Sequence, residues 1–120
     1  MLTFESVTFD AHNPGLLADF WAEMLDWEIT MQNDVEVVIE PKQKGLVVSP
    51  EILFLKVPDD KVVKNRLHFD LRPDNQAVEV ARAETLGAKR IEIGQSLDPD
   101  TTWVVMADPE GNEFCILRAL

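Results

Sequence analysis

Residues 64–71 read KNRLHFDL, and this stretch, together with ADPEGNEFC at 107–115, decides the fold. In the first stretch Leu67, Phe69 and Leu71 alternate with polar residues, a pattern typical of a half-buried β-strand. In the second, Pro109 and Gly111 suit a tight turn, because proline fixes φ and glycine tolerates positive φ. Strands are therefore expected at 67–72, 101–107 and 112–117, with the last two joined across the turn.

The same order of elements occurs twice along the chain. After the strand at 67–72, Asp74 is expected to cap a helix that Gly87 ends, and a strand follows at 88–93. The first half offers a helix opened by Asn13-Pro14, between strands expected at 3–10, 27–31, 35–40 and 52–57. Phe54 and Phe114 occupy matching places 60 residues apart. This repetition indicates a duplicated strand–helix–three-strand unit and an α+β fold.

Composition limits the classes of function. The chain has 120 residues, which fits a single domain with its own core. The net charge is −11, which disfavours nucleic acid and anionic membrane surfaces as partners. The lone cysteine, Cys115, excludes an internal disulfide. Because neither a signal-peptide pattern nor a membrane-length apolar run is present, we expect a cytoplasmic protein with no membrane contact.

The duplicated unit and the two quoted stretches resemble the glyoxalase-like branch of the vicinal oxygen chelate superfamily, over essentially the whole chain. That superfamily includes glyoxalase I, bleomycin-resistance proteins, fosfomycin-resistance enzymes and extradiol dioxygenases. The resemblance implies one glyoxalase-like domain of two βαβββ modules, at about 1–58 and 65–120. The modules are expected to form a cupped mixed sheet with the helices on its convex side and a ligand cavity on the other. It also implies a homodimer, in which modules can swap between chains.

The same resemblance implies positions for metal ligands on the first and last strands of each module. In this sequence those positions hold Ser6, Leu55, His68 and Cys115. Leu55 cannot bind a metal and Ser6 is a weak neutral ligand. Because His68 and Cys115 alone make an incomplete site, we expect no metal and no other cofactor. A divalent metal held with the help of Glu113 or Asp70 is the alternative.

The candidate site lies on the polar face of the expected sheet. His68 and Asp70 form its centre, and His68 is the candidate catalytic residue. The candidate ligand-binding residues are Ser6, Thr8, Asp70, Trp103, Glu113 and Cys115. Plainer interpretations exist for the central residues: a hydrogen-bonded histidine, a buried cysteine that acts as a small hydrophobe, and an Asp70 and Arg72 that pair with each other or with the opposite strand. Lys61, Lys64 and Arg66 suit either a solvated connector or contacts with an anion.

Three classes of function follow from these residues. The first is a bleomycin-resistance-like protein that binds a small molecule without the usual metal, and the charge of −11 suits a cationic ligand. The alternative is a lyase or isomerase of the glyoxalase type, with His68 as base or in an atypical metal site. The third is an interaction module, because a fold does not fix a function.

Overall fold

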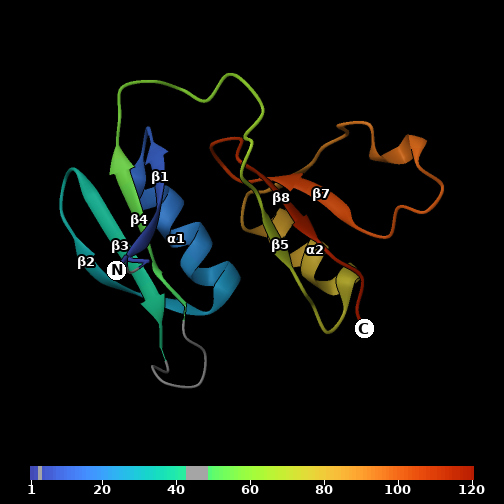
Figure 1. Cartoon of the computed structure of the whole chain (residues 1–120), viewed down its shortest axis with the longest axis horizontal. Helices are drawn as coiled ribbons and strands as arrows, with labels where there is room; N and C mark the ends of the chain where they lie inside the picture. Colours follow the sequence, from blue (N-terminus) through green and yellow to red (C-terminus); the bar gives the residue numbers. More distant parts are fainter. Residues whose placement is uncertain (3, 43–48) are drawn as a thin grey trace. The chain divides into compact units, whose positions relative to one another are not determined.

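The computed structural model describes residues 1–2, 4–42 and 49–120 (Figure 1). In it the chain forms two compact units, Met1–Asp60 and Lys61–Leu120, called module one and module two below. Residue 3, which the first expected strand included, lies outside the described residues. Within the described ranges no helix is both long and apolar enough to cross a membrane.

Module one has the expected order of a strand, a helix and three strands. Its elements are β1 (Ser6–Ala11), α1 (Pro14–Leu25), β2 (Trp27–Gln32), β3 (Glu36–Pro41) and β4 (Glu51–Lys56). The strands form one sheet in the order β1-β4-β3-β2, in which β1 and β4 are parallel and the other pairs antiparallel. Helix α1 packs against β2, β3 and β4 of this sheet.

Module two repeats this arrangement with shorter strands. Its elements are β5 (Phe69–Leu71), α2 (Gln76–Thr85), β6 (Lys89–Arg90), the 3-10 turn η1 (Gln95–Leu97), β7 (Val104–Ala107) and β8 (Glu113–Ile116). The sheet order β5-β8-β7-β6 matches that of module one, with β5 and β8 again parallel. The predicted α+β fold of two βαβββ modules is therefore confirmed.

Aromatic packing explains the position of α1. The Phe9 ring stacks on Phe54 at 5.4 Å and on Trp21 of α1 at 6.1 Å, measured between ring centroids. Trp21 and Phe54 are fully buried. Phe9 and Phe54 are also paired in the β1–β4 register, so one face of this strand pair carries the helix-facing core. Because side chains alternate along a strand, Thr8 and Asp10 of β1 lie on the opposite face.

The helix ends follow local chemistry, with one correction. Asn13 caps α1 as predicted, since its side-chain oxygen accepts a hydrogen bond from the amide of Leu16 at 3.2 Å. In α2 the predicted cap Asp74 is wrong, because Asn75 performs this role through the amide of Val78 at 3.1 Å. Either side chain can cap a helix, and the backbone becomes helical one residue later than expected. Gly87, with φ +114°, follows the helix end as predicted.

The strand predicted at 67–72 is shorter than expected. Strand β5 begins at Phe69 because its partner β8 pairs only over Phe114–Ile116. Leu67 therefore lies outside the sheet, and it is 69% exposed rather than facing the helix as its spacing suggested. The strand expected at 88–93 is likewise confined to Lys89–Arg90, with one further backbone bond from Ile91 to Val105.

Candidate functional site

Pairing of the two parallel strands of module two brings the central polar residues together. In the β5–β8 register Asp70 is the partner of Cys115, one position beyond the partners Phe69 and Phe114. Because side chains alternate along a strand, Asp70 and Cys115 lie on the face opposite the buried Phe114. The sequence predicted that these two side chains share the polar face of the sheet, and the structure places them on one face.

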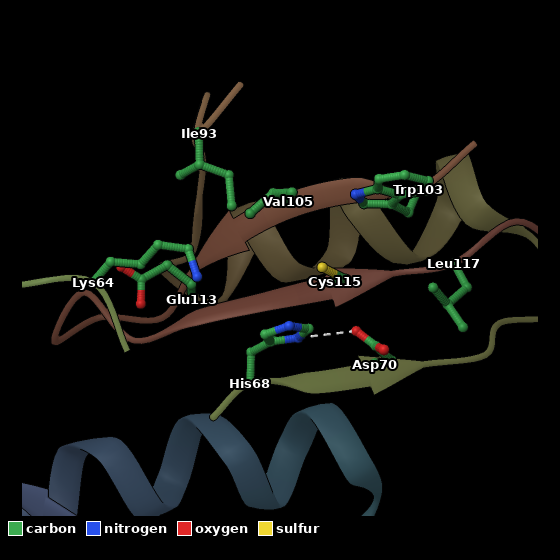
Figure 2. Close-up of a pocket in the computed structure, with 9 residues that line it drawn as sticks. All are labelled: Lys64, His68, Asp70, Ile93, Trp103, Val105, Glu113, Cys115 and Leu117. Atoms are coloured by element: carbon green, nitrogen blue, oxygen red, sulfur yellow. Dashed lines mark hydrogen bonds and ion pairs between the residues drawn. The ribbon is translucent and has the colours of Figure 1, made fainter. Parts of the chain in front are cut away.

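His68 lies just before β5 and turns toward Asp70 (Figure 2). Its Nδ1 is 3.1 Å from Oδ1 of Asp70, and the two side chains are 41% and 53% exposed. A carboxylate at this distance orients the imidazole and selects which ring nitrogen carries the proton. The plainer interpretation of Asp70 as the partner of Arg72 is wrong, because Arg72 Nη1 donates to the carbonyl oxygen of Arg118 at 2.7 Å.

Cys115 is a buried free thiol beside Asp70. Burial is the largest influence on it, and a hydrogen bond to Asp70 with the charge of that carboxylate acts in the same direction. Together they raise the pKa of the Cys115 thiol to about 11. The thiol is therefore protonated at neutral pH and is a poor nucleophile in this state. One ligand atom each of His68, Asp70 and Cys115 lie within 4.8 Å of one another.

These three residues border an open cavity of about 360 Å³. The residues that line the cavity all belong to module two: Lys64, His68, Asp70, Ile93, Trp103, Val105, Glu113, Cys115 and Leu117. Figure 2 shows the histidine and aspartate on the β5 side, Trp103 and Val105 on the β7 side, and Cys115 of β8 between them. One wall is thus polar and the other apolar, an arrangement that suits a small molecule of mixed character.

Glu113 lines the cavity, but its carboxylate is bound by two residues of the segment before β5, Lys61 and Asn65. Lys61 Nζ donates to its Oε1 at 2.8 Å, and the Asn65 amide donates to its Oε2 at 3.0 Å. Burial acts to raise the pKa of the Glu113 carboxyl, but the bonds from Lys61 and Asn65 outweigh it and the pKa is lowered. Lys61 is accordingly an internal ion-pair partner and not the solvated residue of the plainer interpretation. Glu113 is already satisfied by these donors, which makes it a poor additional metal ligand.

The turn before β8 fixes this arrangement. Asp108 Oδ1 accepts from the amides of Glu110 and Asn112, both at 2.9 Å, and Gly111 has φ +90°. The side chain of Asn112 bonds in turn to Asp108 and to Asn65. The predicted structural role of the Asp-Pro-Glu-Gly turn is confirmed, and the turn also connects β8 to the segment that carries Lys61.

Ser6 and Thr8 lie on β1 of module one and are not among the residues that line this cavity. Their role in ligand binding stays a prediction. The 60-residue correspondence of Phe9 with Phe69 makes Thr8, and not Ser6, the counterpart of His68. By the same offset Asp10 corresponds to Asp70 and Leu55 to Cys115. Module one therefore lacks the imidazole and the thiol at its equivalent positions.

Sequence reasoning missed three apolar lining residues. Val105 pairs with Cys115 across β7 and β8, and Leu117 lies two residues beyond Cys115. The two-residue period of these strands was a signal that pointed to both. Ile93 lies in an irregular segment, where no comparable pattern exists.

A second, shallower cavity of about 420 Å³ lies in module one at the start of α1. Its lining includes His12, Asn13 and Lys56, and His12 Nδ1 is 3.5 Å from Oδ1 of Asp60. Its lining contains neither a tryptophan, tyrosine or phenylalanine ring nor a sulfur atom.

A family model described as a glyoxalase-like domain matches residues 6–117. The chain belongs to this family. The match covers both modules, and the superfamily resemblance predicted from the sequence is confirmed. A search of curated proteins finds no significant match to this glyoxalase-like domain.

Solved structures show the same fold at low sequence identity. A glyoxalase/bleomycin resistance protein/dioxygenase family enzyme from Burkholderia phytofirmans is 17% identical, with a TM-score of 0.69 over 97% of this chain and 98% of that one. A fosfomycin resistance protein from Mesorhizobium loti is 11% identical, with a TM-score of 0.68 over 100% and 94%. A bleomycin-binding protein complexed with bleomycin is 13% identical, with a TM-score of 0.60 over the whole of both chains. These likenesses establish the glyoxalase-like fold and leave the ligand to be argued from the cavity.

Proposed function

We propose that the protein binds a small molecule in the module two cavity, without the four-ligand metal site that the resemblance implies. The observation that carries this proposal is the cavity's division into an apolar wall, with Trp103 and Val105, and a polar wall with His68 and Asp70. An aromatic ring provides a large contact area, and a few fixed polar groups orient the ligand. Leu55 at one of the implied metal positions supports the absence of the four-ligand site.

The ligand is proposed to be cationic. Asp70 offers an exposed carboxylate at the cavity, and the Trp103 ring attracts cations through its π face. The net charge of −11 favours the approach of a cation. Lys64 provides an opposing charge at the same cavity, so a ligand with separate cationic and polar groups fits better than a simple ion.

Three probes with one phenyl ring and different charges test this proposal: phenylethylamine, 2-phenylethanol and 3-phenylpropionate. Saturation-transfer NMR is expected to show the amine binding most tightly and the carboxylate least. Trp103→Ala should remove binding of all three, whereas Asp70→Asn should remove only the preference for the amine. Asp10→Asn, at the equivalent place in module one, is the matched control and should change neither.

The outcomes separate the two parts of the proposal. Binding that survives Trp103→Ala, or the absence of any binding, contradicts the module two cavity as the ligand site. Preferential binding of the carboxylate contradicts the cationic ligand while leaving the cavity in place.

A second function, proton transfer of the glyoxalase type, is supported by the geometry of His68. An Nδ1–H that donates to Asp70 leaves Nε2 as the basic nitrogen of the imidazole. A histidine oriented in this way can remove a proton next to a carbonyl group. The test is conversion of the hemithioacetal of methylglyoxal and glutathione by the wild-type protein and by His68→Gln. This function predicts turnover that the substitution abolishes, and equal rates with both proteins contradict it.

The quaternary structure is proposed to be a homodimer, as the family resemblance implies. Val62, Val63 and Leu67 are strongly exposed, and apolar side chains gathered in one segment are common where chains associate. Sedimentation equilibrium should give twice the 13.6 kDa of one chain, and a mass of 13.6 kDa contradicts the dimer. The free thiol of Cys115 fits the proposed cytoplasmic location, where thiols stay reduced.

A further inference from the structure

We propose that the ligand of the module two cavity is an extended zwitterion, which places a cationic group at Asp70 and an anionic group at Lys64. This inference rests on the proposed function, because it names the class of small molecule that the same cavity takes. It adds a defined anionic group to the cationic ligand and fixes how far apart the two groups lie.

The cavity presents one charge of each sign to a ligand. With histidine counted as neutral, the charged side chains among the described residues that line it are Lys64, Asp70 and Glu113. Glu113 is already neutralised by Lys61, whose Nζ is 2.8 Å from its Oε1. The Cys115 thiol is uncharged at neutral pH, because its pKa is raised to about 11. The positive charge of Lys64 and the negative charge of Asp70 therefore remain for a ligand.

Both of these groups have hydrogen-bonding capacity left. Lys64 Nζ donates to the carbonyl oxygen of Asn65 at 3.2 Å, and an ammonium group has three donors. Because that carbonyl is uncharged, the positive charge of Lys64 can still meet an anion. A carboxylate has about four acceptor sites, so the half-exposed Asp70 can accept from a ligand ammonium as well as from His68 and Cys115.

The two charges lie at different places along β8. Asp70 is the register partner of Cys115. Lys64 lies beside Glu113, whose carboxylate accepts from the backbone amide of the next residue, Asn65 (Figure 2). Glu113 precedes Cys115 by two residues, and two residues of a strand span about 7 Å. A ligand with adjacent charges can therefore meet only one of these groups at a time, whereas an extended zwitterion meets both.

The apolar wall suits the middle of such a ligand. Val105 is the partner of Cys115 across β7 and β8, so its side chain lies on the same face beside that residue. Trp103 and Ile93 extend this wall (Figure 2). A ring or aliphatic chain between the two charged groups buries apolar surface here. The ligand class is thus an amino acid whose ammonium and carboxylate are separated by an apolar spacer.

The test compares four ligands built on one benzene ring, titrated into the full chain at neutral pH and low salt and followed by amide NMR. The compound 4-(aminomethyl)benzoate carries both charges at opposite ends of the ring. Its relative 4-(aminomethyl)benzamide keeps only the cation, and 4-(hydroxymethyl)benzoate keeps only the anion. Phenylglycine is an isomer of the first compound with adjacent charges. We expect 4-(aminomethyl)benzoate to bind about 3-fold or more tightly than each of the others, the gain expected from one exposed ion pair.

Two variants assign the two ends of the ligand. Lys64→Gln should reduce the affinity for 4-(aminomethyl)benzoate to that for the benzamide and leave the benzamide unchanged. Asp70→Asn should reduce it to that for 4-(hydroxymethyl)benzoate. Lys56→Gln removes a positive charge at the cavity of module one and is the matched control for the change in net charge. It should leave the order of the four ligands unchanged.

The outcomes separate this inference from the proposed function. Equal binding of 4-(aminomethyl)benzoate and the benzamide, or an advantage that persists in Lys64→Gln, contradicts the anionic end and leaves the cationic ligand in place. Phenylglycine that binds as tightly as its isomer contradicts the extended separation. If none of the four ligands binds, or if binding survives Trp103→Ala, the proposed function fails and this inference fails with it. The comparison of ligands on the wild-type protein does not depend on whether a variant folds.

Discussion

The two modules share the same pairing of parallel strands and differ in the side chains that these strands present. Phe9 and Phe54 in module one correspond to Phe69 and Phe114 in module two, each pair joined across parallel strands. At the neighbouring positions module one has Thr8, Asp10 and Leu55, whereas module two has His68, Asp70 and Cys115. The duplicated sheet therefore supplies the same positions twice, and only module two places an imidazole, a carboxylate and a thiol on them together.

The modules also differ in the interactions that stabilise each of them internally. Helix α1 buries Leu17, Phe20, Trp21 and Met24, whereas the buried residues of α2 are Val80 and Ala83. Module two compensates with a polar network in which Lys61 and Asn65 bind Glu113 and Asn112. The larger apolar core thus lies in the module without the candidate site, and the site lies beside the polar network.

The largest expected effect comes from the aromatic core of module one. Trp21→Ala should lower the free energy of unfolding by about 3–5 kcal/mol, because Trp21 is fully buried against Phe9. Val80→Ala in α2 removes fewer buried atoms and should cost less. Urea denaturation measures both, and an equal cost for the two variants contradicts the difference between the cores.

The next effect concerns the polar network of module two. Glu113→Gln should cost about 1.5–3 kcal/mol at neutral pH, since it weakens charged hydrogen bonds from Lys61 and Asn65. The pKa of Glu113 is lowered by folding, so its carboxylate stabilises the protein above about pH 4.5. This contribution is lost as pH falls through the lowered pKa.

Urea denaturation as a function of pH checks that sign. The difference in stability between wild type and Glu113→Gln should shrink in acid. Glu5→Gln, an exposed substitution in module one, is the control and should have little effect at any pH. A difference that is constant with pH contradicts the ion-pair assignment.

A smaller effect distinguishes the two candidate caps of α2. Asn75→Ala should cost about 1 kcal/mol, because it removes the acceptor for the amide of Val78. Asp74→Ala should change stability by less than about 0.5 kcal/mol. Thermal unfolding of the two variants checks the assignment, and the reverse order restores Asp74 as the cap.

The smallest effect concerns thiol reactivity. The rate of Cys115 alkylation by iodoacetamide should rise with pH toward a midpoint of about 11. Asp70→Asn removes a negative charge and should lower this midpoint, because a neighbouring carboxylate disfavours the thiolate. Burial keeps the midpoint above the ordinary value for a thiol. Asp10→Asn should have no effect, and an unchanged profile in Asp70→Asn contradicts the contact between Asp70 and Cys115.

Most of the fold could be predicted from the sequence because its signals are local. Alternation identifies the strands around Phe54 and Phe114, and Asn13-Pro14 opens a helix through its own side chain and ring. The errors in strand length arise where the pairing with a neighbouring strand determines where a strand begins and ends. Strand β5 is short because it pairs with only three of the four residues of β8, and no pattern within 67–72 encodes that limit.

The candidate site could be predicted only in part, because some of its contacts join residues far apart in the sequence. His68, Asp70 and Cys115 follow from alternation and the family resemblance, and the structure brings them together. The ion pair of Lys61 with Glu113 spans 52 residues, so the sequence could not reveal that Glu113 is already held. Ile93 was missed because its segment has no period to follow.

The central claim is that module two alone carries the ligand site, and amide NMR of the ¹⁵N-labelled full chain tests it most directly. On addition of phenylethylamine, we expect amide shifts concentrated at β7 and β8, around Trp103 and Cys115, and their loss in Trp103→Ala. Shifts concentrated instead around His12 and Lys56, at the cavity of module one, would contradict it.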